Sequence, residues 1–211
     1  MSGEAVLHDY WRSSAAYRVR IVLNLKGVAY RSVQVDLRAG EQARGAFHAL
    51  NPQGLIPALE IDGHVLTQSL AIIDYLDATR KDPPMVSSDP LRRSRTLAQA
   101  LIVAADIHPI NNLRVVNALR GDFAATEEQV ATWTRHWIAS GFSALEASAP
   151  DSGLFGGSKP DLADVCLLPQ MYNARRFDTD LSPYPRLTRI DAELRALEAF
   201  ARAAPEAVRP A

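Results

Sequence analysis

A strand-to-helix junction occupies the stretch Trp11-Arg12-Ser13-Ser14-Ala15-Ala16-Tyr17-Arg18-Val19-Arg20, which follows an apolar strand pattern at Val6–Asp9. Two hydroxyl groups and a guanidinium stand at this turn. The N-terminus of the helix adds unpaired N–H donors and a partial positive charge, so the junction favours an anion. A thiolate is one such anion. Because the only cysteine, Cys166, lies far along the sequence, we expect a thiolate here to belong to a ligand.

Strands and helices alternate over the first eighty residues. Apolar residues recur at i, i+3 and i+4 where helices are expected, and alternate with polar residues where strands are expected. Asp62-Gly63 marks a hairpin, and Ser69 is expected to cap the helix that follows it. The predicted order is a βαβαββα pattern: strand 6–9, helix 14–26, strand 30–35, helix 40–50, strand 57–61, strand 65–66 and helix 70–79.

The character of the sequence changes after residues 81–88, which combine two prolines with small polar residues and show no periodicity. Only helical patterns follow, beginning with Asp89 as an N-cap and Pro90 at the first helical position. They lie at 91–119, 127–147, 162–174 and 187–203, and the tail 205–211 is expected to be frayed. We therefore predict two domains, an α/β domain over 1–80 and an all-helical domain over 89–211, joined by a linker at 81–88.

Composition argues against several classes of protein. The formal net charge of the 211 residues is −1, which gives no electrostatic reason to expect nucleic acid or an anionic membrane as a partner. No apolar run approaches the length of a membrane span, and a single cysteine fits a reducing compartment, so we expect a cytoplasmic protein. The histidines His8, His48 and His64 lack the spacing of metal ligands, and no metal is expected.

Two loops flank the expected strands at 57–66. In Asn51–Pro57, a cis Ile56–Pro57 bond would let Ile56 turn its backbone N–H and C=O toward a bound peptide, although most such bonds are trans. In Gln68-Ser69, serine is first of all a good N-cap. The same turn can also offer a hydroxyl, an amide and the helix dipole to a carboxylate.

Pro109 interrupts the long helical pattern at 91–119. It removes the hydrogen bond to Ala105 and should kink the helix, which would free backbone groups near His108 and Asn112. A lone helical histidine is often structural or solvated, so the residues alone leave its role open.

Two polar pairs flank the helix expected at 162–174. Asp161-Leu162-Ala163-Asp164 before it is interpreted as a capping box, and therefore as a folding element. Arg175-Arg176 at its end is expected from the helix dipole alone, but a guanidinium also suits a dicarboxylate ligand.

These segments together resemble the glutathione S-transferase family, and most closely its zeta class. The zeta signature Ser-Ser-Cys-Ser-aromatic-Arg-Val-Arg-Ile is matched by Ser13–Ile21. The family's Asn-Pro-x-x-x-x-Pro loop is matched by Asn51–Pro57, and its Gln-Ser-x-Ala-Ile-Ile segment by Gln68–Ile73. The order and spacing of the motifs are specific, and the resemblance covers nearly the whole chain. It implies a thioredoxin-like N-terminal domain followed by a helical domain.

The resemblance implies a glutathione-dependent cis–trans isomerase that converts maleylacetoacetate to fumarylacetoacetate in the degradation of aromatic compounds. It also implies a homodimer. The implied roles are thiolate stabilisation by Ser13 or Ser14, glutathione binding by Gln53, Ile56, Gln68, Ser69, His108 and Asn112, and binding of substrate carboxylates by Arg12 and Arg176.

Three alternatives stay open. The substrate could be maleylpyruvate, since the acyl tail is distinguished by the shape of the pocket. A general glutathione transferase, conjugating or dehalogenating small electrophiles, needs the same thiolate but less carboxylate recognition. A non-catalytic glutathione-binding protein is the third. Ala15, which replaces the cysteine of the zeta signature, keeps it open, while the intact Ser13, Ser14, Gln68 and Ser69 argue against it, and Ala16 replaces the next serine. Chemistry that requires that cysteine should be absent, whereas a thiolate supported by serine can survive.

Overall fold

A computed structural model of the chain describes residues 4–210. It divides into two compact units, the first formed by the residues up to Met85 and from Ala196 onward, the second by Val86–Arg195. The division near Met85 lies inside the segment expected to be a linker. At the other end the units differ from the expected domain 89–211, because the last residues of the chain pack with the first unit.

The first unit is built on a four-stranded mixed sheet with the order β2-β1-β3-β4. β1 (Ala5–Asp9) pairs in parallel with β2 (Tyr30–Gln34) and antiparallel with β3 (Ala58–Ile61), and β3 pairs antiparallel with β4 (His64–Thr67). The helical elements are α1 (Ser14–Leu25), the short 3-10 turn Glu41–Ala43, α2 (Gly45–Leu50) and α3 (Ser69–Thr79). The order βαβαββα and the thioredoxin-like fold are therefore confirmed.

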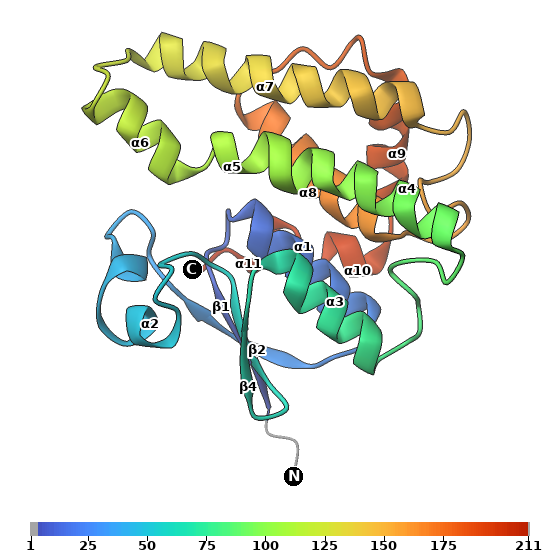
Figure 1. Ribbon diagram of the computed structural model, residues 1–211, viewed down its shortest axis with the longest axis horizontal. Helices are drawn as coiled ribbons and strands as arrows, with labels where there is room; N and C mark the ends of the chain where they lie inside the picture. The colour runs from blue at the N-terminus through green and yellow to red at the C-terminus, as the bar shows by residue number, and fades with distance from the viewer. Residues whose placement is uncertain (1–3, 211) are drawn as a thin grey trace. The chain divides into compact units, whose positions relative to one another are not determined.

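Helices cover both faces of the sheet. Successive residues of β1 point to opposite faces. His8 lies on the face of α2, where its ring centroid is 5.8 Å from that of Phe47. Leu7 and Asp9, both fully buried, lie on the other face, which α1 and α3 cover side by side (Figure 1).

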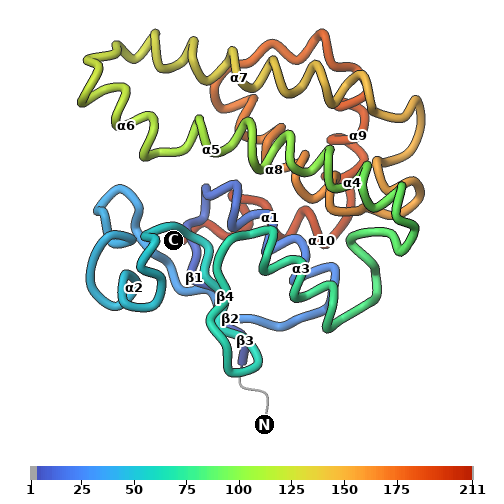
Figure 2. Tube along the Cα trace, viewed as in Figure 1, coloured from blue at the N-terminus to red at the C-terminus, as the bar shows by residue number. Residues whose placement is uncertain are grey.

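The C-terminal segment returns to α1, and α10 (Glu198–Ala201) lies beside it (Figure 2). Phe200 is fully buried there. The carbonyl of Ala203 accepts a hydrogen bond of 2.9 Å from Arg20 Nε. The expected single helix over 187–203 is wrong, because α9 (Pro185–Arg195) ends at the border of the second unit and α10 belongs to the first.

The expectation of a frayed tail is also wrong for most of its length. Pro205–Val208 form a last turn of helix, α11, and Pro205 is buried. Ala211 lies outside the described residues.

The second unit is helical in the part of the chain that the structure describes. Its elements are α4 (Pro90–Leu101), the π-helix Ile102–Ile107, α5 (His108–Ile110), α6 (Leu113–Gly121), α7 (Glu127–Ser148), α8 (Leu162–Arg176) and α9. Asp89 caps α4 as predicted, accepting from Arg92 N at 2.8 Å. Over residues 4–210, no helix combines the length and the apolar character needed to cross a membrane.

The expectation of one helix over 91–119 is wrong, because the chain departs from α-helix on both sides of Pro109. Proline has no N–H to donate to the carbonyl four residues earlier. Residues Ile102–Ile107 widen into a π-helix, and α5 ends one turn later at Ile110. A new helix, α6, begins after Asn112, whose Oδ1 accepts from Arg114 N at 3.2 Å. The break is thus larger than the kink that the sequence predicts.

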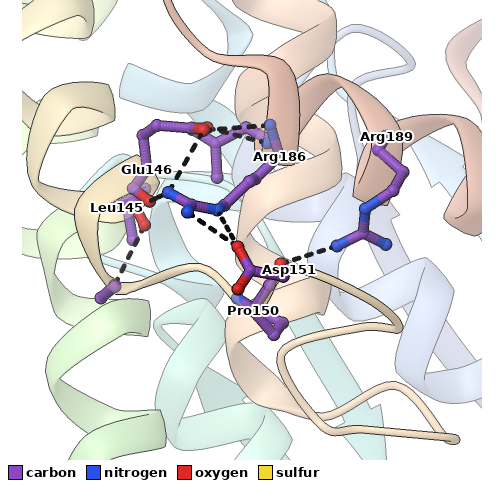
Figure 3. A network of polar contacts seen from close by, with 8 residues as sticks. Leu145, Glu146, Pro150, Asp151, Arg186 and Arg189 are labelled. Carbon is purple, nitrogen blue, oxygen red and sulfur yellow. Dashed lines mark hydrogen bonds and ion pairs between the residues drawn. The ribbon is translucent and has the colours of Figure 1, made fainter.

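A network of polar contacts fixes the start of α9 against the end of α7 (Figure 3). The carboxylate of Glu146 accepts from the backbone N–H groups of Arg186 and Leu187, each at 3.0 Å. Arg186 Nε also donates to Asp151 Oδ1 at 2.8 Å. A carboxylate at the N-terminus of a helix satisfies donors that have no partner within the helix. The contacts therefore tie two helices that are distant in sequence.

The capping box predicted before α8 is present. Asp161 accepts from Ala163 N at 2.8 Å, and Asp164 accepts from Asp161 N at 3.0 Å. Asp164 also accepts from the N–H groups of Phe155 and Gly156. Burial, with the nearby charge of Asp161, raises the pKa of Asp164 to about 7. This aspartate pair is a folding element, as predicted.

Candidate functional site

The N-terminus of α1 places the two serines differently. Ser13 is the N-cap, and its Oγ accepts from Ala16 N at 3.2 Å. That bond uses a lone pair and leaves the hydroxyl proton free to be donated. Ser14 is the first residue of the helix and is half-buried. Both hydroxyl groups therefore stand where the first-turn N–H groups and the helix dipole favour an anion.

The guanidinium of Arg12 lies beside this helix N-terminus. Its Cζ is 4.7 Å from the ring centroid of Trp11 and 6.0 Å from that of Tyr10. Nη2 donates to the hydroxyl of Tyr10 at 3.2 Å, while Nε is buried without a hydrogen-bond partner. Arg12 makes no ion pair with any residue between 4 and 210. The aromatic rings thus hold a cation whose charge no described carboxylate balances.

A buried ion pair between Asp9 and Arg20 holds the turn that carries Trp11 and Arg12. Arg20 Nη1 lies 2.7 and 2.8 Å from the two carboxylate oxygens of Asp9. Arg20 Nη2 also donates to the backbone carbonyl of Trp11 at 3.1 Å. The sequence pattern did not single out Arg20. Its signal would have been an arginine on the helix face that carries Tyr17 and Ile21, both buried.

The loop Asn51–Pro57 is organised by its first residue. Asn51 Nδ2 donates to the carbonyl of Leu55 at 2.6 Å, and Asn51 Oδ1 accepts from Gln53 N at 3.2 Å. The Ile56–Pro57 peptide bond is cis, the less common of the two possibilities. The two sequence-predicted residues, Gln53 and Ile56, therefore lie in a loop whose backbone is held by hydrogen bonds to the side chain of Asn51.

Gln68, and not Ser69 as expected, occupies the N-cap position of α3. Ser69 was expected to cap α3, but it is the first helical residue, and its hydroxyl accepts from Arg18 Nη1 at 3.4 Å. The N-cap position belongs to Gln68, whose backbone has φ 66° and ψ 117° and whose side chain makes no capping bond. Such angles are strained for a residue with a Cβ, and strain of this kind is often found at binding sites.

The structure brings two of the sequence-predicted residues into direct contact. Gln68 Nε2 donates to Gln53 Oε1 at 2.7 Å, so the loop before β3 and the start of α3 present one pair of amides. Each amide keeps further donors or acceptors for a ligand.

In the second unit, His108 and Asn112 flank the break after the π-helix. His108 is the first residue of α5, and Asn112 uses its Oδ1 as the cap of α6. π-helical turns are frequent at functional sites because they displace backbone and side chains from regular positions. The contact of either residue with glutathione stays a prediction.

Arg175 and Arg176 are distinguished by their partners. Arg175 forms an ion pair with Asp191, which is fully buried and also held by Arg195 at 3.1 Å. Arg176 Nη1 donates to Asn173 Oδ1 at 3.4 Å, and its Cζ lies 5.0 Å from the ring centroid of Phe177. Arg175 thus joins α8 to α9 through a buried carboxylate. The binding of a substrate carboxylate by Arg176 stays a prediction.

Comparison with known proteins supplies independent evidence. The family described as "Glutathione S-transferase, N-terminal domain" matches residues 12–79. A protein named probable maleylacetoacetate isomerase, from Vibrio cholerae, is 50% identical over 95% of both chains.

Solved structures give the same family relationship. The holo structure of a maleylpyruvate isomerase, described as a bacterial zeta-class glutathione S-transferase, is 45% identical with a TM-score of 0.95, covering 98% of this chain and 99% of the other. Maleylacetoacetate isomerase from Methylobacterium extorquens AM1, solved with bound malonate and glutathione, is 39% identical with a TM-score of 0.93, covering 98% and 100%.

Proposed function

The chain belongs to the zeta class of the glutathione S-transferase family, and from this premise we propose that it is a glutathione-dependent cis–trans isomerase of maleylacetoacetate. The observation that carries the proposal is the junction at residues 11–14. There the N-terminus of α1 and two serines adjoin Arg12, which no described carboxylate pairs with. An isomerase of this kind has to stabilise a thiolate and orient a substrate with two carboxylates.

The residues of the first unit fit glutathione. When bound, glutathione supplies the thiolate that adds to the maleyl double bond and leaves after rotation about the resulting single bond. Ser13 or Ser14 would donate a hydrogen bond to the sulfur, and the first-turn N–H groups of α1 would favour its charge. Serine is sufficient for this task, so Ala15 in place of the zeta-class cysteine is compatible with it.

The peptide portion of glutathione would be held by the loop Asn51–Pro57 and the start of α3. The strained backbone of Gln68, whose side chain is hydrogen-bonded to that of Gln53, favours a binding site at the start of α3. Ile56 would supply backbone groups, Gln53 and Gln68 their amides, and Ser69 the hydroxyl that Arg18 already contacts. His108 and Asn112 are proposed as further contacts, with Asn112 using its Nδ2 because Oδ1 caps α6.

Two arginines would bind the carboxylates of the substrate. A guanidinium matches a carboxylate with two parallel N–H donors, which fixes orientation as well as adding affinity. Arg12 would do so next to the thiolate and Arg176 at the end of α8. A small electrophile without carboxylates would leave both unused, which favours isomerase over general conjugation.

A direct assay tests the proposal. The absorbance of maleylacetoacetate and of maleylpyruvate is followed with the enzyme, with and without glutathione, and a small electrophile is offered in parallel. We expect glutathione-dependent isomerisation, with a higher kcat/KM for maleylacetoacetate than for maleylpyruvate. Maleylpyruvate is kept as the alternative substrate because this chain resembles the holo structure of a maleylpyruvate isomerase. Conjugation without any isomerisation would contradict the proposal.

A cytoplasmic homodimer is part of the same proposal. It is supported by the family and by the single cysteine, Cys166, which is buried. Sedimentation at several protein concentrations measures the oligomeric state, and a mass of one chain at micromolar concentration would contradict the dimer.

A further inference from the structure

We infer that Arg209, two residues before the end of the chain, is a specificity residue that binds a carboxylate of the substrate together with Arg12. This inference rests on the proposed function, because it adds a second arginine to the substrate site at the start of α1. Neither the strand and helix patterns nor the family motifs single out Arg209.

The indole of Trp11 gathers two positive charges. Arg12 Cζ lies 4.7 Å and Arg209 Cζ 5.1 Å from the centroid of its ring. The two guanidinium groups therefore lie within about 10 Å of each other, both within cation–π distance of one side chain. An indole is the strongest of the aromatic platforms for such contacts.

No carboxylate of residues 4–210 forms an ion pair with either arginine. Arg12 Nε is buried without a partner, and Arg209 is exposed at the surface. Two like charges at this separation raise each other's free energy, and a carboxylate close to both lowers it. Since no carboxylate among residues 4–210 balances this pair, it is suited to an anion that arrives from solution.

The placement of Arg209 is determined by the fold of the first unit. Arg20 donates both to the carbonyl of Trp11 at 3.1 Å and to the carbonyl of Ala203 at 2.9 Å. One buried guanidinium thus holds the turn before α1 and the segment that leads into the tail. Pro205 is buried at the start of α11, and Arg209 directly follows the last residue of this helix.

The carboxylate in question belongs to the substrate more readily than to glutathione. Arg12 directly precedes the serines proposed to hold the sulfur, so groups beside it meet the carbon skeleton that the sulfur attacks. The peptide portion of glutathione is assigned to Gln53, Gln68 and their neighbours. A dicarboxylate thus gains from Arg209, whereas glutathione does not.

Calorimetric titration of malonate into protein saturated with glutathione tests the inference. The variants are Arg209→Ala, Arg209→Lys and, as a matched control, Arg202→Ala, which removes an exposed arginine of the same unit that is paired with Glu198. We expect Arg209→Ala to raise the Kd for malonate about tenfold at low ionic strength and by less at high salt. Arg209→Lys should lose less affinity for malonate than Arg209→Ala, and Arg202→Ala should lose none. Titration of glutathione should give the same Kd in all four proteins.

The outcomes separate this inference from the proposed function. An unchanged Kd for malonate in Arg209→Ala, an equal loss in Arg202→Ala, or no malonate binding by the wild type would overturn the inference. A weakened affinity for glutathione in Arg209→Ala would also overturn it, because the tail would then serve the peptide. A wild-type protein without isomerase activity, in which Arg209→Ala still weakens malonate binding, would refute the proposed function and support a dicarboxylate site.

Discussion

Asp9 and Arg20 form a bidentate ion pair, with Nη1 at 2.7 and 2.8 Å from the two carboxylate oxygens, and neither side chain is accessible to solvent. Asp9 ends β1 and Arg20 lies in the middle of α1, so the pair joins the strand to the helix across the turn that carries Arg12. The remaining donors of Arg20 are used on the carbonyls of Trp11 and Ala203. The pair therefore positions the candidate thiolate site.

The first prediction concerns this pair. Arg20→Met should lower the free energy of unfolding by about 3–5 kcal/mol, because it leaves the carboxyl group of Asp9 buried without its ionic partner. The double variant Asp9→Leu/Arg20→Met should lose less than the sum of the two single variants, since no buried charge remains. Urea denaturation measures all four proteins. Additive losses would show that the two side chains do not depend on each other.

Much of the fold could be predicted from local signals. The Asp62-Gly63 hairpin, the Asp89 cap and the capping box at Asp161 each depend on a few adjacent residues, and each is present. The return of Phe200 to α1 could not be predicted, because helical periodicity continues through residues 187–203 and only packing against a distant helix separates α9 from α10.

The same contrast holds for the candidate site. Ser13 and Ser14 stand in a local motif, and the structure places both at the start of α1. The expectation of Ser69 as the N-cap of α3 was wrong, because serine is by itself the better N-cap but Gln68 holds that position. In the structure the hydroxyl of Ser69 accepts instead from Arg18, a residue 51 positions earlier in the sequence, and a local pattern does not reveal such a contact.

The second prediction separates Ser13 from Ser14. Ser13→Ala should lower the free energy of unfolding by about 1 kcal/mol, because the cap of α1 is lost, whereas Ser14→Ala should leave stability unchanged. Thermal unfolding measures this difference. The pKa of bound glutathione, followed by thiolate absorbance, should rise in whichever variant lacks the donor to the sulfur. A pKa that rises in neither would show that the helix N-terminus alone stabilises the thiolate.

The third prediction concerns the strained backbone of Gln68. Gln68→Gly should raise the free energy of unfolding by about 1 kcal/mol, because glycine adopts a φ of 66° without a clash from Cβ. It should also weaken glutathione binding about tenfold, since the amide is lost. Gln53→Ala is the control, which removes the partner amide without relieving strain and should weaken binding with no gain in stability. If Gln68→Gly gained both stability and affinity for glutathione, the strained backbone of Gln68 would not contribute to ligand binding.

The fourth prediction uses the neighbouring arginines at the end of α8. Arg176→Ala should raise the KM for the maleyl substrate about tenfold, with the KM for glutathione and the melting temperature unchanged. Arg175→Ala should instead lower the melting temperature, because it takes a partner from the fully buried Asp191. Steady-state kinetics and thermal unfolding of both variants measure this. A collapse of glutathione binding in Arg176→Ala would contradict the substrate role.

The fifth prediction follows from the capping box of α8. Burial and the charge of Asp161 raise the pKa of Asp164 to about 7, above its ordinary value of 3.8. Between these two values the folded chain keeps a proton that the unfolded chain has released, so the free energy of unfolding falls as pH rises from about 4 to about 7. Burial also raises the pKa of Asp161, and this shift acts in the same direction.

Asp161→Ser tests the prediction, because serine still caps α8 but carries no charge. Without the neighbouring carboxylate, the pKa of Asp164 should fall toward its ordinary value, at about 1.4 kcal/mol for each unit. Relative to the wild type, the variant should therefore be more stable at pH 8 than at pH 5. Urea midpoints at the two pH values measure this difference. If the variant and the wild type differed in stability by the same amount at pH 5 and pH 8, Asp164 would be ionised at both. The three backbone N–H groups that donate to its carboxylate would then keep it charged.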